Sequence, residues 1–443
     1  MARLTALVAV LFYHSLVSAT ATFSPNCTLP QESTSYVASP NTRGTLDILW
    51  SGLFTIFICI WTVQHLNVPE QRDGRDPGWQ GNVKWALKAF WTKFKWMLLT
   101  LILPEMPLAK ALDDLLAARE ALTRGRNLKE KRRGPLSAQE ISKYWTLTHA
   151  YYANMGGFAF RTSALRPDGK DYQLQYITAN DVLKLRAQGH IAKLPSISEH
   201  EIQDKSKGDF IVKATAVIQV SWLVIQVIVR AKRNLPISQL EITACAFAAC
   251  TFLTYGILWS KPQAVTSCTM IELESTDVEA EATLGDCWED THSMITMFWL
   301  WIERPHMSGS RRRDRPVRND LTFSDDRWYY GGLTIGCIFL GALHCGAWNL
   351  PFPTRPELLL WRYISITSCA ILPVSIGLIW VIDALFSGWS YRYSWLYSYV
   401  HLGMIILYIG CRLYLLFESI YSLFYLPPGA YITTWASNIP HIG

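Results

Sequence analysis

The sequence predicts an all-α membrane protein, a polytopic transmembrane helical bundle of about six spans plus one broken re-entrant or interfacial element. Apolar runs long enough to cross a bilayer alternate with long loops rich in arginine and lysine. Half of the 443 residues are hydrophobic and only 17% are charged, against roughly 25% in soluble domains. Because the basic residues lie in loops beside the apolar runs, the positive-inside rule gives the bundle an orientation.

The net charge of +6 arises from these loops and does not by itself indicate nucleic-acid binding. The chain has neither a zinc-finger spacing of cysteines and histidines nor an RNP-like aromatic motif. We therefore expect the lipid bilayer and a lipophilic small molecule as partners, and no nucleic acid.

The N-terminal segment has the pattern of a signal peptide over residues 1–19. Arg3 precedes an apolar stretch that is too short for a good membrane crossing, and small residues follow it near position 19. Asn26 then opens a glycosylation sequon in a lumenal segment, residues 20–45. The alternative is an uncleaved anchor with an unused sequon. A signal peptide places the protein in the secretory pathway, in the endoplasmic reticulum or the plasma membrane.

The first transmembrane span is expected over residues 46–66, with Asp47 at one end and His65 near the other. A basic region, residues 67–209, follows it and is predicted to be cytosolic. The apolar stretch 97–108 within this region contains two prolines and a carboxylate, which disfavour a straight crossing. If the stretch crossed the bilayer, the basic residues after it would lie outside. We therefore expect it to be a re-entrant or interfacial element.

The end of this region, residues 161–209, is predicted to be a small soluble insert. Two patterns in it resemble capping boxes, in which side chain and backbone satisfy each other's exposed groups at a helix start: Thr178 with Asp181, and Ser198 with Glu201. Gly189 is expected to end the first of these helices. About 50 residues are too few for a large core of their own, so the insert should pack on its neighbours.

Residues 210–259 are predicted to form a transmembrane hairpin of two helices joined by the turn Asn234–Pro236. A cytosolic loop, residues 260–327, is first acidic and then rich in arginine. The last third of the chain is the densest membrane region, with a tail over residues 427–443 after it. Residues 328–426 are expected to hold three spans, at about 328–348, 363–386 and 400–424.

This topology starts outside, so that about six spans place the three basic loops inside and the short loop 349–361 outside. One basic cluster, residues 230–233, contradicts the rule because the same topology leaves it outside.

Charged side chains within apolar spans are the first candidates for function, because burying them in hydrocarbon is costly unless they are paired or hydrated. Glu105 lies between the two prolines of the broken element, where exposed backbone usually lines a cavity. We expect Glu105, Asp383 and His149 to be catalytic acid–base residues. A polar membrane cavity is expected from Asp47, His65, Glu241, His344, Arg412 and Glu418. The alternative is a set of structural ion pairs, Asp383 with Arg412 among them, and of hydrogen-bonded histidines.

The sequence predicts neither a metal site nor a cofactor. It contains no Cys-x-x-Cys, His-Glu-x-x-His, Walker or Gly-x-Ser-x-Gly motif. The pair Asp113–Asp114, with Glu120, is the kind of acidic group that holds magnesium against a diphosphate. A single acidic pair is a weak signal, and a solvated helix face explains it better.

Several phrases of the sequence resemble a family of multi-pass membrane proteins found in filamentous fungi. The phrases are Gly44–Ser51, Lys95–Met97 with Pro104–Glu105, Thr148–His149 with Met155–Phe158, Asp204–Asp209, Leu240–Glu241, Lys261–Pro262 and Ile439–Ile442. The resemblance spans nearly the whole chain and implies a membrane protein, but it carries no catalytic residues. Some similar proteins look like members of secondary-metabolite gene clusters, which implies a role in such a pathway.

The function that fits these observations best is a membrane-embedded tailoring enzyme, such as a cyclase, acting on a lipophilic intermediate of fungal secondary metabolism. Its chemistry would be acid–base catalysis in a membrane cavity. Two alternatives stay open. A small-molecule transporter or channel is one, although the chain has no internal repeat. A non-catalytic scaffold or receptor, whose basic loops meet anionic lipid, is the other.

Overall fold

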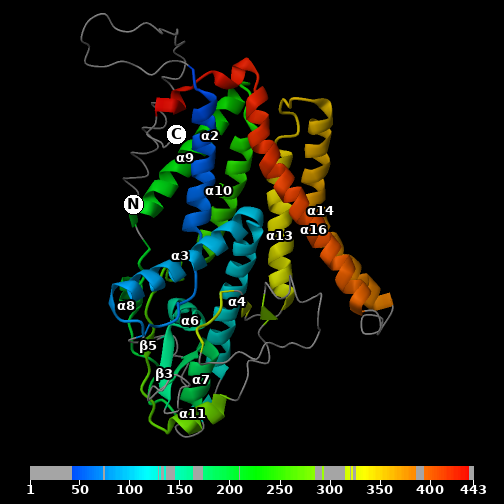
Figure 1. Ribbon diagram of the computed structural model, residues 1–443. Coiled ribbons are helices and arrows are strands. Elements are labelled where there is room, and N and C mark those ends of the chain that lie inside the picture. Colours follow the sequence, from blue (N-terminus) through cyan, green and yellow to red (C-terminus); the bar gives the residue numbers. More distant parts are fainter. Residues whose placement is uncertain are drawn as a thin grey trace, which may run out of the picture.

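The structure is a computed structural model, shown in Figure 1. It describes residues 42–438 apart from 73–74, 128, 131–133, 136–144, 163–172, 209, 285–291, 294–314, 320, 323–325 and 386–393. The predicted signal peptide, the Asn26 sequon and the arginine-rich centre of the loop 260–327 lie outside the described residues. The chain is mostly helical, with long helices gathered at one end and a small α+β domain at the other.

The long helices lie side by side in the upper part of Figure 1. They are α2 (Thr45–Thr62), α9 (Phe210–Lys232), α10 (Gln239–Ile257), α13 (Asp326–Cys345), α14 (Arg355–Leu385) and α16 (Ser394–Tyr421). Among the described residues, five helical segments are long and apolar enough to cross a membrane: Thr45–Thr62, Ile211–Lys232, Gln239–Ile257, Arg355–Ser375 and Leu402–Tyr425. The span predicted at 328–348 corresponds to α13. This helix is not one of the five, because its glycines, tyrosines and His344 lower its mean hydropathy.

The predicted hairpin is present, since α9 and α10 pack on each other and are joined through a turn at Asn234. Asn234 has a φ of +53°, a left-handed conformation that asparagine tolerates better than most residues. Arg230 at the end of α9 is buried and donates to the carbonyl oxygens of Pro236 at 2.7 Å and Ile432 at 2.7 Å. The basic cluster 230–233 therefore includes one arginine that fixes the chain's own backbone.

The broken element consists of two helices, α3 (Gly78–Ile102) and α4 (Glu105–Asn127), that meet at Pro104. The predicted break is confirmed, and Figure 1 shows α3 rising obliquely to the break and α4 descending from it. Glycines of α13 allow that helix to approach α4 closely. A Cβ added to Gly336 would lie 2.7 Å from the Cβ of Glu105, and one added to Gly332 would lie 3.0 Å from the Cα of Ala109.

The lower domain corrects the all-α prediction, because it contains a three-stranded sheet in the order β4-β3-β5. Strand β3 (Phe158–Thr162) pairs antiparallel with β4 (Gln173–Ile177) and parallel with β5 (Thr269–Met270). The remaining short elements are β1 (Lys129–Glu130), β2 (Gly134–Pro135), β6 (His292–Ser293), β7 (Leu321–Thr322), α11 (Asp277–Leu284) and the 3-10 turns η2 (Ser422–Tyr425), η3 (Pro428–Tyr431) and η4 (Trp435–Asn438). A five-residue strand without clear alternation gives little signal in a sequence.

Both predicted capping boxes are confirmed in this domain. Thr178 caps α7 (Ala179–Ala187), and Ser198 caps α8 (Glu199–Asp204). Gly189, with a φ of +80°, follows the end of α7 as expected. The helix α6 (Leu147–Asn154), α4 and the segment after α10 share one apolar core with these elements, so the insert does pack on its neighbours.

Contacts between distant segments assign the loops to two ends of the bundle. Arg43, before α2, donates to the carbonyl oxygen of Ala430 at 2.8 Å, and Gln239 donates to that of Pro351 at 2.6 Å. The start of α2, the loop after α13 and the tail therefore share one end. The pairing of β3 with β5 joins the regions 67–209 and 260–327 at the other end.

Candidate functional site

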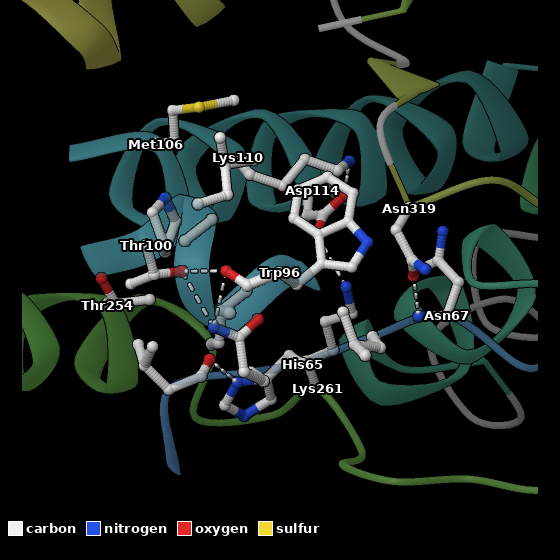
Figure 2. A pocket seen from close by; sticks show the side chains of 17 residues that line it. His65, Asn67, Trp96, Thr100, Met106, Lys110, Asp114, Thr254, Lys261 and Asn319 are labelled. Atoms are coloured by element: carbon white, nitrogen blue, oxygen red, sulfur yellow. Dashed lines mark hydrogen bonds and ion pairs between the residues drawn. The ribbon is translucent and has the colours of Figure 1, made fainter. Parts of the chain in front are cut away.

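A pocket lies where the bundle meets the lower domain, and we call it the junction pocket (Figure 2). The residues that line it come from the segment after α2, from both sides of the break between α3 and α4, and from the end of α10. Its cavity of about 50 Å³ is large enough for a few water molecules or one small chemical group. A whole drug-sized ligand needs several hundred Å³ (~300 or more).

Apolar side chains line part of the junction pocket: Trp96, Leu99, Met106 and Leu258. Charged side chains line it as well. Figure 2 shows Lys110 and Asp114 on α4, with Lys261 reaching Asp114 from the segment after α10. The pocket thus combines an apolar surface with charged groups, as binding sites for small molecules usually do.

Asp114 is at the centre of the charged group. One of its oxygens accepts from the Lys110 ammonium, and the other accepts from the Lys261 ammonium at 2.7 Å. Burial would raise the pKa of Asp114, but the two lysines outweigh it and lower that pKa. For Lys110, burial is outweighed by Asp114 and Asp113, which raise its pKa. For Lys261 burial prevails, and its pKa is lowered despite Asp114.

His65 belongs to the pocket because α2 ends at Thr62, which places His65 in the loop after the helix. Its Nδ1 lies 2.9 Å from the carbonyl oxygen of Val63, so Nδ1 carries the proton and Nε2 is left as the acceptor. Burial, and then the positive charge of Lys261, lower the pKa of His65 to about 4. The imidazole is therefore neutral at physiological pH.

Amide side chains hold this loop in place. Gln64 donates to the Thr100 hydroxyl at 2.9 Å, and so ties the end of α2 to α3. Gln263 donates to the carbonyl oxygens of Thr62 at 2.6 Å and Gln64 at 3.1 Å. Because the backbone groups that α2 leaves open are satisfied in this way, the loop and His65 have a fixed position.

A second polar group extends into the bundle from the break, and we call it the apex cluster: Glu105, His344, Tyr408 and Arg412. The Tyr408 hydroxyl hydrogen-bonds to Glu105, and the charge of Arg412 acts on both Glu105 and His344. Glu105 and Arg412 are each only 1% exposed. Among the described residues, neither terminal nitrogen of Arg412, nor Oε2 of Glu105, nor Nε2 of His344 has a hydrogen-bond partner. Glu105 on α4 and Arg412 on α16 thus lie near each other, and His344, near the end of α13, is within reach of the charge of Arg412.

The other predicted cavity residues lie elsewhere and have structural roles. Glu241 is at the opposite end of the bundle, where it caps α10 through Ser238 and pairs with Arg43 at 2.6 Å. Asp47 is exposed and accepts from the backbone of Gly44 at the start of α2. Glu418 is buried on α16 beside Tyr414. The expectation of one cavity formed by all these residues was wrong.

The predicted catalytic residues are also separated. His149 lies in the lower domain, where Nε2 is 2.8 Å from the carbonyl oxygen of Ile197 and Nδ1 faces the N-cap residue Thr146. Both of its nitrogens are therefore occupied in fixing α6. Asp383 belongs to α14, and its side chain lies outside the described part of the chain.

Two charged residues of the junction pocket, Lys110 and Lys261, are absent from the sequence-based selection, and Asp114, which was interpreted as part of a solvated helix face, is buried. The spacing of Lys110 and Asp114 is a helical i,i+4 pair, which a search for facing charges could have found. Lys261 lies 147 positions from Asp114, and no local pattern links the two.

The fold and the pocket define a mostly helical protein with five candidate membrane spans and a charged pocket at the foot of its bundle. A family model matches residues 10–298, which is more than half of the chain, and the chain belongs to that family, a family of unknown function (DUF8562). The matched range includes His65, Lys110, Asp114 and Lys261, but not His344 or Arg412. No curated protein and no solved structure matches the chain.

Proposed function

We propose that the protein is a multi-pass membrane enzyme of the secretory pathway that carries out acid–base chemistry on the polar end of a lipophilic intermediate. The observation that carries this proposal is the junction pocket, whose lining combines apolar side chains with His65 and the ion pairs of Asp114. As the fungal resemblance implies, the intermediate would belong to secondary metabolism.

The membrane bundle in this proposal has six crossings, formed by the five apolar segments and by α13. The ends of the helices support this count. The start of α13 packs beside α4, near the lower domain, and its end contacts the first turns of α14, where Trp361 donates to the carbonyl oxygen of His344 at 3.1 Å. Because the described tail lies beside Arg43 at the far end, an even number of crossings is needed.

The size of the pocket restricts what can enter. A cavity of about 50 Å³ admits only the reacting group, so the apolar remainder of the substrate would lie along the bundle surface within the bilayer. The apolar lining residues, Trp96 and Leu258 among them, would contact the first carbons of that remainder.

The chemistry that suits the residues is a proton shift. Nε2 of His65 would accept a proton from a carbon next to a carbonyl group and return it to another atom of the same molecule, as in an isomerisation or a cyclisation. The lowered pKa keeps Nε2 unprotonated at neutral pH but makes it a weak base, so the abstraction would depend on stabilising the negative charge that forms on the substrate. Lys261 and Lys110 would stabilise the negative charge that develops on the carbonyl oxygen.

Transport is less well supported, because a translocation path must reach both ends of a bundle. The residues lining the junction pocket come from the end next to the lower domain.

The test is a metabolite profile of a producing strain that lacks the gene, complemented with wild type or with variants. We expect one lipophilic precursor to accumulate in the deletion strain and with His65→Gln, although the variant protein is made at normal levels. His200→Gln, an exposed histidine of the lower domain, is the matched control and should restore the wild-type profile. An unchanged profile in the deletion strain, or full complementation by His65→Gln, would overturn the proposal.

A further inference from the structure

Helix α3 is exposed to an unusual degree for a helix rich in large apolar side chains. From Gly78 to Trp91 only Gly81 is buried, while Trp79 is 73% and Leu87 61% exposed. Soluble surfaces rarely show contiguous apolar patches of this kind unless something covers them.

The exposed apolar side chains of α3 form one stripe. They recur at intervals of three, four or seven to eight residues: Trp79, Val83, Leu87, Phe90, Trp91 and Leu98. At ~100° per residue, this spacing confines them to a face about 120° wide. The helix is therefore amphipathic on its outer side, although only its last turns are packed against the bundle.

Lysines flank the stripe, and the helix contains no acidic residue. They are Lys84, Lys88, Lys93 and Lys95. Lys84 pairs with Asp76 at 2.9 Å and Lys88 with Glu70 at 2.5 Å, both at the surface. Lys93 and Lys95 have no acidic partner in the described part of the chain, so the helix keeps an excess of positive charge beside its apolar stripe.

The position of α3 relates the stripe to the candidate spans. Figure 1 shows α3 running obliquely across the lower ends of α2, α9 and α10. The ammonium of Lys93 lies 3.7 Å from the ring centre of Trp61, in the last turn of α2. A tryptophan near the end of a crossing marks the level of the lipid headgroups, so α3 sits at that level.

We propose that α3 lies in the plane of the membrane on the side of the lower domain, with its stripe inserted at the boundary of headgroups and acyl chains. The lysines along its edges face anionic headgroups, which commits the surface to a negatively charged bilayer. The inference rests on the membrane bundle of the proposed function, but not on its enzymatic role.

The full-length protein in lipid vesicles provides the test. An environment-sensitive fluorescent amino acid is placed at Leu87, on the stripe, or at Ala89, which is also exposed but on the opposite side of the helix. Vesicles contain either neutral lipid alone or about 30% phosphatidylserine. Resistance to carbonate extraction shows separately that the bundle is inserted.

The label at Leu87 should be quenched by a spin-labelled lipid with a shallow doxyl group, and its quenching by aqueous iodide should be about threefold weaker than at Ala89. Replacing Lys84, Lys93 and Lys95 by glutamine should reduce lipid quenching in the anionic vesicles. Equal iodide quenching at both sites in an inserted protein would overturn the proposal. So would protection of Leu87 from both quenchers in a protein that sediments as a dimer, because a second copy would then cover the stripe.

Discussion

The substitution Asp114→Asn should destabilise the protein severely through the two lysines that it leaves behind. Asp114 is buried and accepts from both Lys110 and Lys261, whose side chains are 14% and 3% exposed. Removing one partner of a buried ion pair typically costs about 3–5 kcal/mol, because the remaining charge is buried without compensation. Lys110 retains Asp113 at 3.2 Å, so Lys261 should cause most of the loss.

The loss should depend on pH in a definite direction. Burial already lowers the pKa of Lys261, and without Asp114 this pKa falls further below its value of about 10.4 in the unfolded chain. Between these two pKa values the unfolded chain binds more protons than the folded protein, so the variant gains stability as the pH rises. Asp114→Asn should therefore recover part of its stability between pH 7 and pH 9.

Unfolding by denaturant in nanodiscs, followed by circular dichroism, measures these free energies. The control is Glu120→Gln on the same helix, because Glu120 pairs with Arg124 at 2.7 Å but both side chains are about half exposed, and such pairs contribute roughly 0–1 kcal/mol. A loss for Asp114→Asn no larger than the control's, or a loss that grows with pH, would refute the reasoning.

Two further predictions concern His65 and the helix α13. The pKa of His65 is lowered to about 4 in the folded protein. Its contribution to stability is therefore present above pH ~6.5 and is lost as the pH falls from there towards 4. Over this range the unfolding free energy of the wild type should drop more than that of His65→Gln. A Cβ at Gly336 would meet α4 at 2.7 Å, whereas one at Gly331 meets nothing within 4 Å. Gly336→Ala should therefore lower the free energy of unfolding by about 1–3 kcal/mol through overpacking. Gly331→Ala should raise it by up to about 1 kcal/mol through helix propensity. Equal unfolding midpoints for the two variants would contradict the close approach of the two helices.

Sequence patterns predicted correctly those features that depend on interactions between neighbouring residues. The capping boxes at Thr178 and Ser198, the break at Pro104 and the turn at Asn234 were all predicted, because each depends on a few neighbouring residues. The same rule could have been applied to Ser238, whose capping box with Glu241 removes that carboxylate from the candidates for a membrane cavity.

The candidate site was predicted only in part. Glu105, His344 and Arg412 were chosen because charge is costly in an apolar span, and the charge of Arg412 does act on both of the others. His149 was chosen on the same grounds and lies in a different domain, since a short aromatic helix looks alike in a membrane interface and in a soluble core.

The sequence by itself determined the helical character, the apolar segments and the broken element, because periodicity and composition are properties of neighbouring residues. Only the tertiary structure decided which charges are partners. Asp114 and Lys261 lie 147 positions apart, and burial makes their pairing necessary. Burial depends on how the helices pack, and the residues next to Asp114 or Lys261 in the sequence do not reveal that packing.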